Sequence, residues 1–179
     1  MGNLFSTMEK QSYLIRAAAL DFGVQWLLWS VAAYFQTEKF YDLAGSATFL
    51  LLTWQTLNWG KKYFSRQVVQ SGCVSIWALR LGLFLFTRVL REQGDSRFNR
   101  VRNNPGKFFI YWSLQGLWIW VTLLPTIILN TTEKDEKLSW KDCLGWVLWA
   151  AGFLIETTAD YQKSQFKSDP INAGNHLIS

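Results

Sequence analysis

The chain has 179 residues, of which 50% are hydrophobic and 17% aromatic, including 11 Trp. Its mean hydropathy is only +0.04, because strongly apolar runs alternate with charged connectors. In a membrane protein, the net charge of +5 is first a signal of topology and a source of attraction to anionic lipid. Nucleic acid is therefore a poor candidate partner. Cys73 and Cys143 lie in apolar segments and the single histidine, His176, lies in the tail, so the sequence argues against a disulfide framework, a metal site and a Ser-His-Asp hydrolase.

Five apolar runs follow one another along the chain, and polar connectors separate them. They cover residues 17–35, 43–57, 73–90, 108–129 and 143–159. A helix needs about 20 apolar residues to cross the bilayer core, so the fourth run qualifies outright, whereas the second and fifth must borrow flanking residues. We therefore predict an all-α, multi-pass transmembrane bundle of about five spans, built as a single integral-membrane domain over residues 1–179. Pro125 is expected to kink or end the fourth helix.

Four charged residues lie inside these runs. Asp21 interrupts the first run, Arg80 and Arg88 interrupt the third, and Glu156 lies near the end of the fifth. An arginine that faces lipid is costly, so both arginines should face the bundle or extend to an interface. Arg88 is close enough to the end of its run to do the latter. Arg80 is deeper, and it fits a structural ion pair or a substrate-binding site equally well, with Asp21 and Glu156 as its natural partners.

The connector 91–107 is the most basic in the chain. The positive-inside rule therefore places it in the cytosol, which puts the amino terminus outside and makes the connector 130–142, with its sequon at Asn130, lumenal. Guanidinium groups suit bidentate phosphate binding, although an ordinary loop whose charge only sets topology explains the same residues. The cations of this connector are Arg91, Arg97, Arg100, Arg102 and Lys107.

A charged stripe marks the end of the fifth run. At 100° per residue, Glu156, Asp160, Lys163 and Lys167 fall within about 60° of one another on a helix. Charge at membrane depth usually lines a cavity or pathway. The alternative is an amphipathic helix that leaves the bilayer, with acid before base as the helix dipole and i,i+4 pairing favour. If the stripe and the basic connector emerge on one side, they offer a dinucleotide many cations and a few carboxylates, although no Gly-rich Rossmann or P-loop fingerprint is present.

Four stretches give the chain a resemblance to the amino-terminal part of the steroid 5α-reductase-like membrane reductases, and in particular to their DUF1295-type branch. They read KFYDLAGS at 39–46, WALRLG at 77–82, GDSRF at 94–98 and ETTADYQK at 156–163, and together they span most of the chain in order. Members of this family reduce an activated C=C bond in a lipid-like substrate with NADPH bound from the cytosolic side.

The resemblance also implies roles for individual residues. Asp160 and Glu156 would reach hydroxyl or amide groups of NADPH, and Lys163 and Lys167 would reach its phosphates. The stretch NRVR at 99–102 is similar to a basic segment that helps to hold the dinucleotide, which adds Arg100 and Arg102 to the cofactor-binding set.

Two departures from the family pattern matter. A substrate-binding tyrosine is expected three residues before an arginine at the end of the third span. If that arginine is Arg88, this chain has Leu85 there, which argues against a steroid substrate. The family also continues with an Arg-His-Pro-Asn-Tyr-type motif and further helices. We therefore expect the chain to lack part of the family's carboxy-terminal cofactor site.

Three functions remain open at this point. The first is the membrane reductase, located in the endoplasmic reticulum if the source is eukaryotic. The second is a related methyltransferase of the isoprenylcysteine type, whose S-adenosylmethionine carries no phosphate, so that the basic connector would only set topology. The third is a truncated, non-catalytic membrane protein that acts through partner helices.

Overall fold

The computed structural model describes residues 2–92 and 94–169, and these residues form helices and no strand. The all-α prediction is thereby confirmed, and each of the five apolar runs lies within one helix, except for Phe35 just after the first helix. At most of their ends, the helices extend beyond the apolar runs into polar residues. They are α1 (Gly2–Tyr34), α2 (Tyr41–Gly60), α3 (Ser65–Arg91), the 3₁₀ turn η1 (Ser96–Phe98), α4 (Pro105–Asn130) and α5 (Trp140–Ser168).

The chain divides into two compact units. Unit 1 is Met1–Asp135 and contains α1 to α4, and unit 2 is Glu136–Ser179 and contains α5. Whether both belong to a single integral-membrane domain stays a prediction. Unit 2 is a single long helix in its described part, and Asp142 begins it by accepting a hydrogen bond from the backbone N–H of Ser139 at 2.8 Å.

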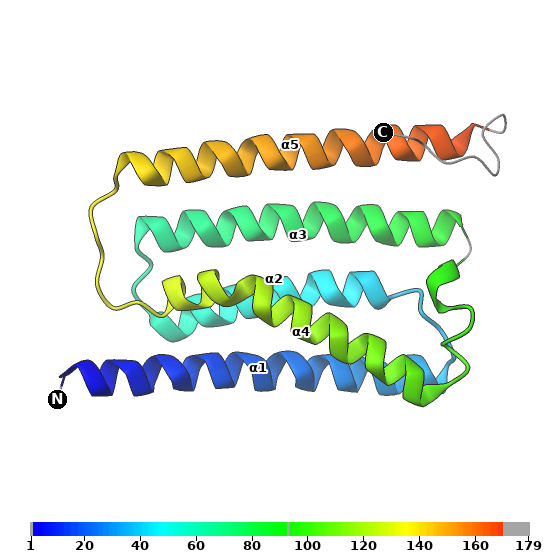
Figure 1. Cartoon of the computed structure of the whole chain (residues 1–179), viewed down its shortest axis with the longest axis horizontal. Coiled ribbons are helices and arrows are strands. Elements are labelled where there is room, and N and C mark those ends of the chain that lie inside the picture. The colour runs from blue at the N-terminus through cyan, green and yellow to red at the C-terminus, as the bar shows by residue number, and fades with distance from the viewer. Residues whose placement is uncertain (1, 93, 170–179) are drawn as a thin grey trace. The chain divides into compact units, whose positions relative to one another are not determined.

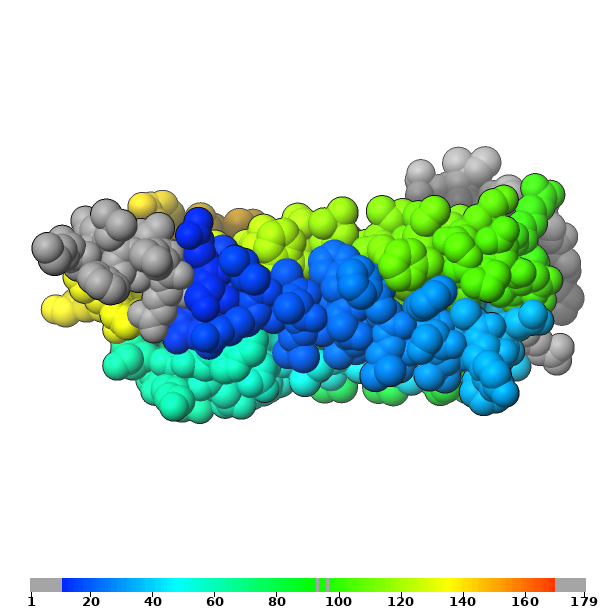
Figure 2. Space-filling model, turned by 90° about the horizontal axis from the view of Figure 1, so that it is seen from below, coloured from blue at the N-terminus to red at the C-terminus, as the bar shows by residue number. Residues whose placement is uncertain are grey.

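Unit 1 is an antiparallel four-helix bundle. Helices α1 and α3 run in one direction and α2 and α4 in the other (Figure 1). Helix α1 packs chiefly on α4, and α2 packs on both α3 and α4. Figure 2 shows the side chains of α1, in blue, lying along those of α4, in green. The first end of this bundle, called the charged end below, holds connectors 35–40 and 92–104, and the second, called the amide end, holds connectors 61–64 and 131–135.

Three of the described helices are long and apolar enough to cross a membrane. They are Gln11–Tyr34 within α1, the whole of α3 and the whole of α4. Helices α2 and α5 do not reach that level, in line with their short apolar runs. The three helices are consistent with an integral membrane protein.

The ends of the helices follow from local sequence. Helix α4 begins where Asn104 accepts a hydrogen bond from the N–H of Lys107 at 3.1 Å, and Pro105 fills the first helical position, where no N–H is needed. Helix α2 ends at Gly60 and is capped by Lys61, whose φ of 54° is left-handed and whose N–H donates to the carbonyl of Leu57. Pro125 lies inside α4, which continues to Asn130, so it does not end the helix.

The amide end is closed around Asn130, whose side chain is fully buried. Its Nδ2 donates to the carbonyl of Thr53 at 3.1 Å and to the hydroxyl of Thr56 at 3.2 Å, and its Oδ1 accepts from the hydroxyl of Ser71. Asn130 is also the last residue of α4 and not part of a connector. The connector therefore begins one residue later than the sequence predicted, and the amide nitrogen of the sequon asparagine holds α4 to α2.

Candidate functional site

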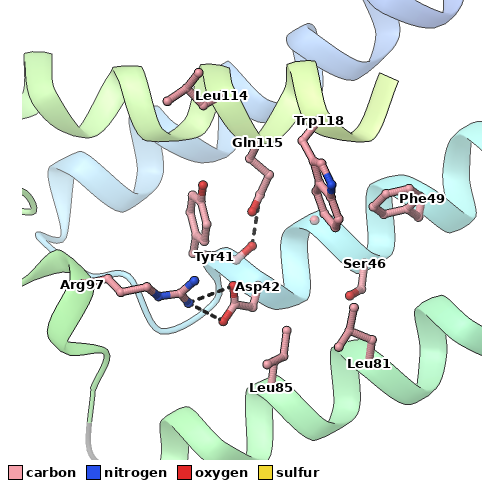
Figure 3. Close-up of a pocket in the computed structure, with 11 residues that line it drawn as sticks. Tyr41, Asp42, Ser46, Phe49, Leu81, Leu85, Arg97, Leu114, Gln115 and Trp118 are labelled. Carbon is pink, nitrogen blue, oxygen red and sulfur yellow. Dashed lines mark hydrogen bonds and ion pairs between the residues drawn. The ribbon is translucent and has the colours of Figure 1, made fainter. Parts of the chain in front are cut away.

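A cavity of about 350 Å³ lies between α2, α3 and α4 near the charged end (Figure 3). This volume is within the range of small-molecule sites, about 300–1,000 Å³. Its lining is polar on one side and apolar on the other. The lining residues are Tyr41, Asp42, Gly45, Ser46 and Phe49 from α2, Leu81 and Leu85 from α3, Leu114, Gln115 and Trp118 from α4, and Arg97 from the connector 92–104.

The apolar wall is formed by aromatic and leucine side chains. Phe49 makes an edge-on contact with Trp118, with ring centroids 5.1 Å apart, and a second one with Trp77. Trp118 and Leu114 are about half exposed, at 50% and 57%. The wall therefore continues from the cavity to the outer surface of the helices, where a membrane helix meets lipid.

Ion pairs form the polar rim of the cavity. Arg97 donates from Nη2 to Asp42 at 2.9 Å and from Nε to Asp95 at 2.8 Å. Arg88 reaches both carboxylates from α3, at 3.4 Å each. Arg88 therefore does not simply extend to an interface, because it joins α3 to the first turn of α2 and to the connector that follows α3.

A second ion pair ties the two connectors of the charged end together. The carboxylate of Glu38 is buried, with 1% of its side chain exposed, and it pairs with Arg102 at 3.3 Å. Its other oxygen accepts from the backbone N–H of Asp95 at 3.2 Å. Phe98 lies beneath these groups, 1% exposed, and its ring is 4.7 Å from that of Tyr41. Connectors 35–40 and 92–104 therefore close this end as one structure.

The electrostatics of the rim keep both partners of the Arg97–Asp95 pair ionised. Burial alone would raise the pKa of Asp95, but the hydrogen bonds from Arg97 and the charges of Arg97 and Arg88 hold it below its usual range. The hydrogen bond to Asp95 and the charge of Asp42 raise the pKa of Arg97, and these effects outweigh its burial. The positive charges of Arg88 and Arg97 thus neutralise the negative charges of Asp42 and Asp95 at the rim of the cavity.

The cofactor-binding residues predicted from the sequence fall in both units. Arg100 is exposed in the connector 92–104, and Arg102 is committed to Glu38 while 38% of its side chain stays exposed. Glu156, Asp160, Lys163 and Lys167 all lie on α5, which is one continuous helix, so the prediction that they share one helical face stands. Their role in cofactor binding stays a prediction.

The predicted environment of Arg80 is partly wrong. Asp21 is fully buried, and neither of its carboxylate oxygens has a hydrogen-bond partner among the described residues. The expected ion pair between Asp21 and Arg80 is therefore not formed, because Asp21 faces the interior between α1 and its neighbours. Arg80 itself is not among the residues that line the cavity, although its neighbour Leu81 is. A substrate-binding role for Arg80 stays a prediction.

The residues that the structure brings together at the cavity are chiefly Asp42, Ser46, Arg97 and Gln115. None of them was among the site residues predicted from the sequence, although Arg97 was named as a cation of the basic connector. A signal for three of them was present. Asp42 and Ser46 lie in the stretch 39–46, Arg97 lies in the stretch 94–98, and Leu81 lies in the stretch 77–82. Three of the four stretches that carry the family resemblance therefore supply walls of one cavity. Gln115 had a weaker signal, as an uncharged polar residue in an apolar helix.

Comparison with known proteins gives one result. Residues 28–179 match the model of a family described as a protein of unknown function, DUF1295. The match begins in the last two turns of α1 and includes the cavity, the charged end and α5. No curated protein and no solved structure matches the chain.

Proposed function

The chain belongs to the DUF1295 family, and on this premise we propose that it acts as an NADPH-dependent reductase of an activated C=C bond in a lipid-like enone or enoyl substrate. The observation that carries the proposal is the cavity between α2, α3 and α4, which joins an apolar wall to a charged rim. The resemblance to steroid 5α-reductase-like enzymes supports it, because three of the stretches on which it rests line this one cavity.

The position of the cavity suits a substrate that arrives from a bilayer. Leu114 and Trp118 extend the apolar wall to the surface of α4, so a lipid-like molecule can enter without crossing the charged end. Leu85 lines the cavity at the place where the resemblance leads one to expect a tyrosine. This leaves the wall more apolar there and supports a substrate other than a steroid.

The chain also carries residues whose chemistry fits NADPH. Arg100, Lys163 and Lys167 are exposed cations suited to phosphates, and Arg102 keeps part of its guanidinium exposed beside Glu38. Asp160 and Glu156 are suited to accept hydrogen bonds from ribose hydroxyls. When bound, NADPH would supply the hydride for the carbon β to the substrate carbonyl, and the α carbon would take its proton from solvent at the charged rim.

Residues of the cavity would activate the substrate. A carbonyl conjugated to the double bond can accept a hydrogen bond from the hydroxyl of Ser46 or from the guanidinium of Arg97, and either bond makes the β carbon more electrophilic. Tyr41 is not available for this, because its hydroxyl donates to the carbonyl of Tyr111 at 2.8 Å. The apolar wall excludes water from the reacting carbons. In a eukaryotic cell, we place the reaction in the endoplasmic reticulum membrane.

Titration of NADPH and of a lipid-like enone against the chain in membranes tests the proposal. Lys163→Ala and Lys167→Ala should each weaken NADPH affinity about tenfold through the loss of a charge-assisted contact to phosphate, and should leave enone affinity unchanged. Lys141→Ala is the matched control, because Lys141 lies on the same helix near its other end.

Three outcomes of this titration contradict the proposal. If both variants weaken the enone as much as NADPH, the lysines act on the fold and not on the cofactor. Binding of S-adenosylmethionine without NADPH would indicate a membrane methyltransferase. Absence of any cofactor binding by a folded, inserted chain would indicate a non-catalytic protein.

A further inference from the structure

Thr48, Gln25 and Gln115 form a chain of hydrogen bonds inside unit 1. The backbone carbonyls at its two ends determine which group donates and which accepts at each step. Thr48 donates its hydroxyl hydrogen to the carbonyl of Ala44 at 2.8 Å, so its oxygen can only accept from Gln25, whose Nε2 lies 3.0 Å away. Gln25 must then present its oxygen to Gln115, whose Nε2 donates to it at 3.0 Å. A backbone carbonyl accepts and never donates, so the order of donors cannot be reversed.

The second hydrogen of the Gln115 amide is used as well, because Nε2 also donates to the carbonyl of Tyr41 at 3.2 Å. Both amide hydrogens are therefore committed to Gln25 and Tyr41, and no donor from the described part of the chain reaches Oε1. Gly45 leaves space for this arrangement, since a Cβ at that position would lie 3.1 Å from Oε1 of Gln115. Gln115 is 93% buried, and it lines the cavity beside Gly45. It offers the cavity a fixed hydrogen-bond acceptor.

Ser46 gives the same cavity a hydroxyl. It lies one residue after Gly45, its side chain is shown among the cavity residues in Figure 3, and 8% of it is exposed. Unlike Thr48 and Thr53, whose hydroxyls donate to the carbonyls one turn earlier, the hydroxyl of Ser46 makes no hydrogen bond within the described part of the chain. A hydroxyl in a largely buried residue that has no protein partner is satisfied when a ligand or water in the cavity supplies one.

The charges at the rim do not call for a charged ligand. Arg88 and Arg97 are matched by Asp42 and Asp95 within hydrogen-bonding distance. A carboxylate or an ammonium group in the cavity would have to compete with an existing pair, and it would pay its own desolvation cost. The charge of Arg97 at the cavity is already matched, and the polar groups that remain without a hydrogen-bond partner on α2 and α4 are uncharged, one acceptor and one hydroxyl.

We propose that the cavity selects an uncharged, lipid-like molecule that carries a hydroxyl group, whose O–H donates to Oε1 of Gln115 while Ser46 provides a second uncharged partner. The choice of a lipid-like occupant rests on the proposed function, and the hydroxyl is the addition. An analogue whose hydroxyl has been converted to an ether or an ester has no O–H to donate, and it leaves Oε1 of Gln115 without a hydrogen bond. A site built around a buried acceptor discriminates strongly against such analogues.

Photolabelling of the full chain in detergent micelles tests this without any cofactor or turnover. The probe is decanol with a diazirine in its alkyl chain, and the competitors are unlabelled decanol, its methyl ether and decanoate. Saturable labelling is expected on peptides that contain Leu85 or Leu114. The ether and decanoate should compete about tenfold more weakly than the alcohol, because neither donates a hydrogen bond and decanoate adds an unmatched charge.

Two variants assign the preference to these residues. Gln115→Met should abolish the difference between alcohol and ether, and Ser46→Ala should reduce it. Gln70→Met is the control for the first, because Gln70 makes a single inter-helix bond to Thr126 outside the cavity. Ser30→Ala, on the exposed side of α1, is the control for the second. If Gln115→Met does not fold, the wild-type comparison and Ser46→Ala decide the matter.

The inference is overturned if the ether or decanoate competes as well as the alcohol on the wild-type chain, or if no probe labels the cavity saturably. It is also overturned if Ser46→Ala and Gln115→Met both fold and keep the full preference. Its failure is distinct from failure of the proposed function. An alcohol preference without enone reduction would overturn only the reductase, and reduction without that preference would overturn only the hydroxyl-bearing ligand.

Discussion

The amide end of unit 1 is held by neutral groups that are wholly buried, whereas the charged end is held by ion pairs that remain partly in contact with solvent. At the amide end, Asn130 and Gln67 are 0% and 1% exposed, and Gln67 donates to the carbonyl of Leu129 at 2.9 Å. At the charged end, the side chain of Arg97 is 51% exposed while its partner Asp95 is 8% exposed. Helix ends are closed in both places.

This difference indicates that the amide end has a structural role, whereas the charged end can also bind a ligand. Neutral amides that satisfy one another leave nothing for a ligand to bind, and they tolerate low polarity around them. The half-exposed Arg97 lines the cavity, and an ion pair in contact with solvent can exchange partners at low cost. The cavity lies at the charged end, near the groups that can still interact. Substitutions should therefore act mainly on stability at one end, and on both stability and binding at the other.

The largest effect is expected at the amide end. Asn130→Asp keeps the size of the side chain, but it sets a carboxylate oxygen against the carbonyl of Thr53 and buries a charge. Loss of a buried donor and burial of an unpaired charge should cost about 3 kcal/mol or more of unfolding free energy. Thermal unfolding in detergent measures it. Asn103→Asp is the control, because Asn103 is exposed at the charged end, and equal losses from both would remove the distinction between the ends.

A smaller loss is expected from Arg97→Ala. The side chain is half exposed, so solvent screening limits its contribution to stability to about 1 kcal/mol, although it bridges Asp42 and Asp95. Its effect on binding should be larger, because it removes a cation from the cavity and leaves the lining carboxylate of Asp42 with Arg88 alone. Arg100→Ala, in the same connector, should change neither quantity. Unfolding experiments and enone titrations on both variants would show whether Arg97 affects enone binding more than stability.

The smallest effect is a dependence of stability on pH. The pKa of Asp95 is lower in the folded chain than its ordinary value of 3.8, so the folded state binds this proton less readily than the unfolded state. Its stabilising contribution is complete well above about pH 4 and is lost as the pH falls through the lowered folded value. The melting temperatures of wild type and Asp95→Asn should therefore converge in acid. A difference that stays constant down to about pH 3 would exclude this carboxylate as the cause.

The helices were predictable from the sequence because an apolar run of membrane length has few alternatives to a helix. The run 108–129 is the clearest case, and it lies entirely within α4. The limits of helices were harder to predict. Asn130 follows an apolar run and precedes two threonines, so it reads as the start of a loop, yet its hydrogen bonds to α2 extend the helix by one more buried residue.

The cavity was not predictable in the same way, because it depends on how the helices are rotated about their axes. Asp21 and Arg80 lie at depths where an ion pair is reasonable, but Asp21 is turned inward, where no cation meets it. Ser46 and Gln115 lie 69 positions apart, and nothing in either neighbourhood indicates that they face one space. The indication came from three of the four resemblance stretches, which line the cavity together.

The ion pairs of the charged end join segments that the ribosome makes at different times. Glu38 and Asp42 belong to the hairpin of α1 and α2, whereas their cationic partners Arg88, Arg97 and Arg102 all belong to the hairpin of α3 and α4. Until the second hairpin has been synthesised, neither carboxylate can form the ion pair that it makes in the folded chain. Closure of the charged end therefore requires both hairpins, and a nascent chain that ends before Arg88 cannot form it.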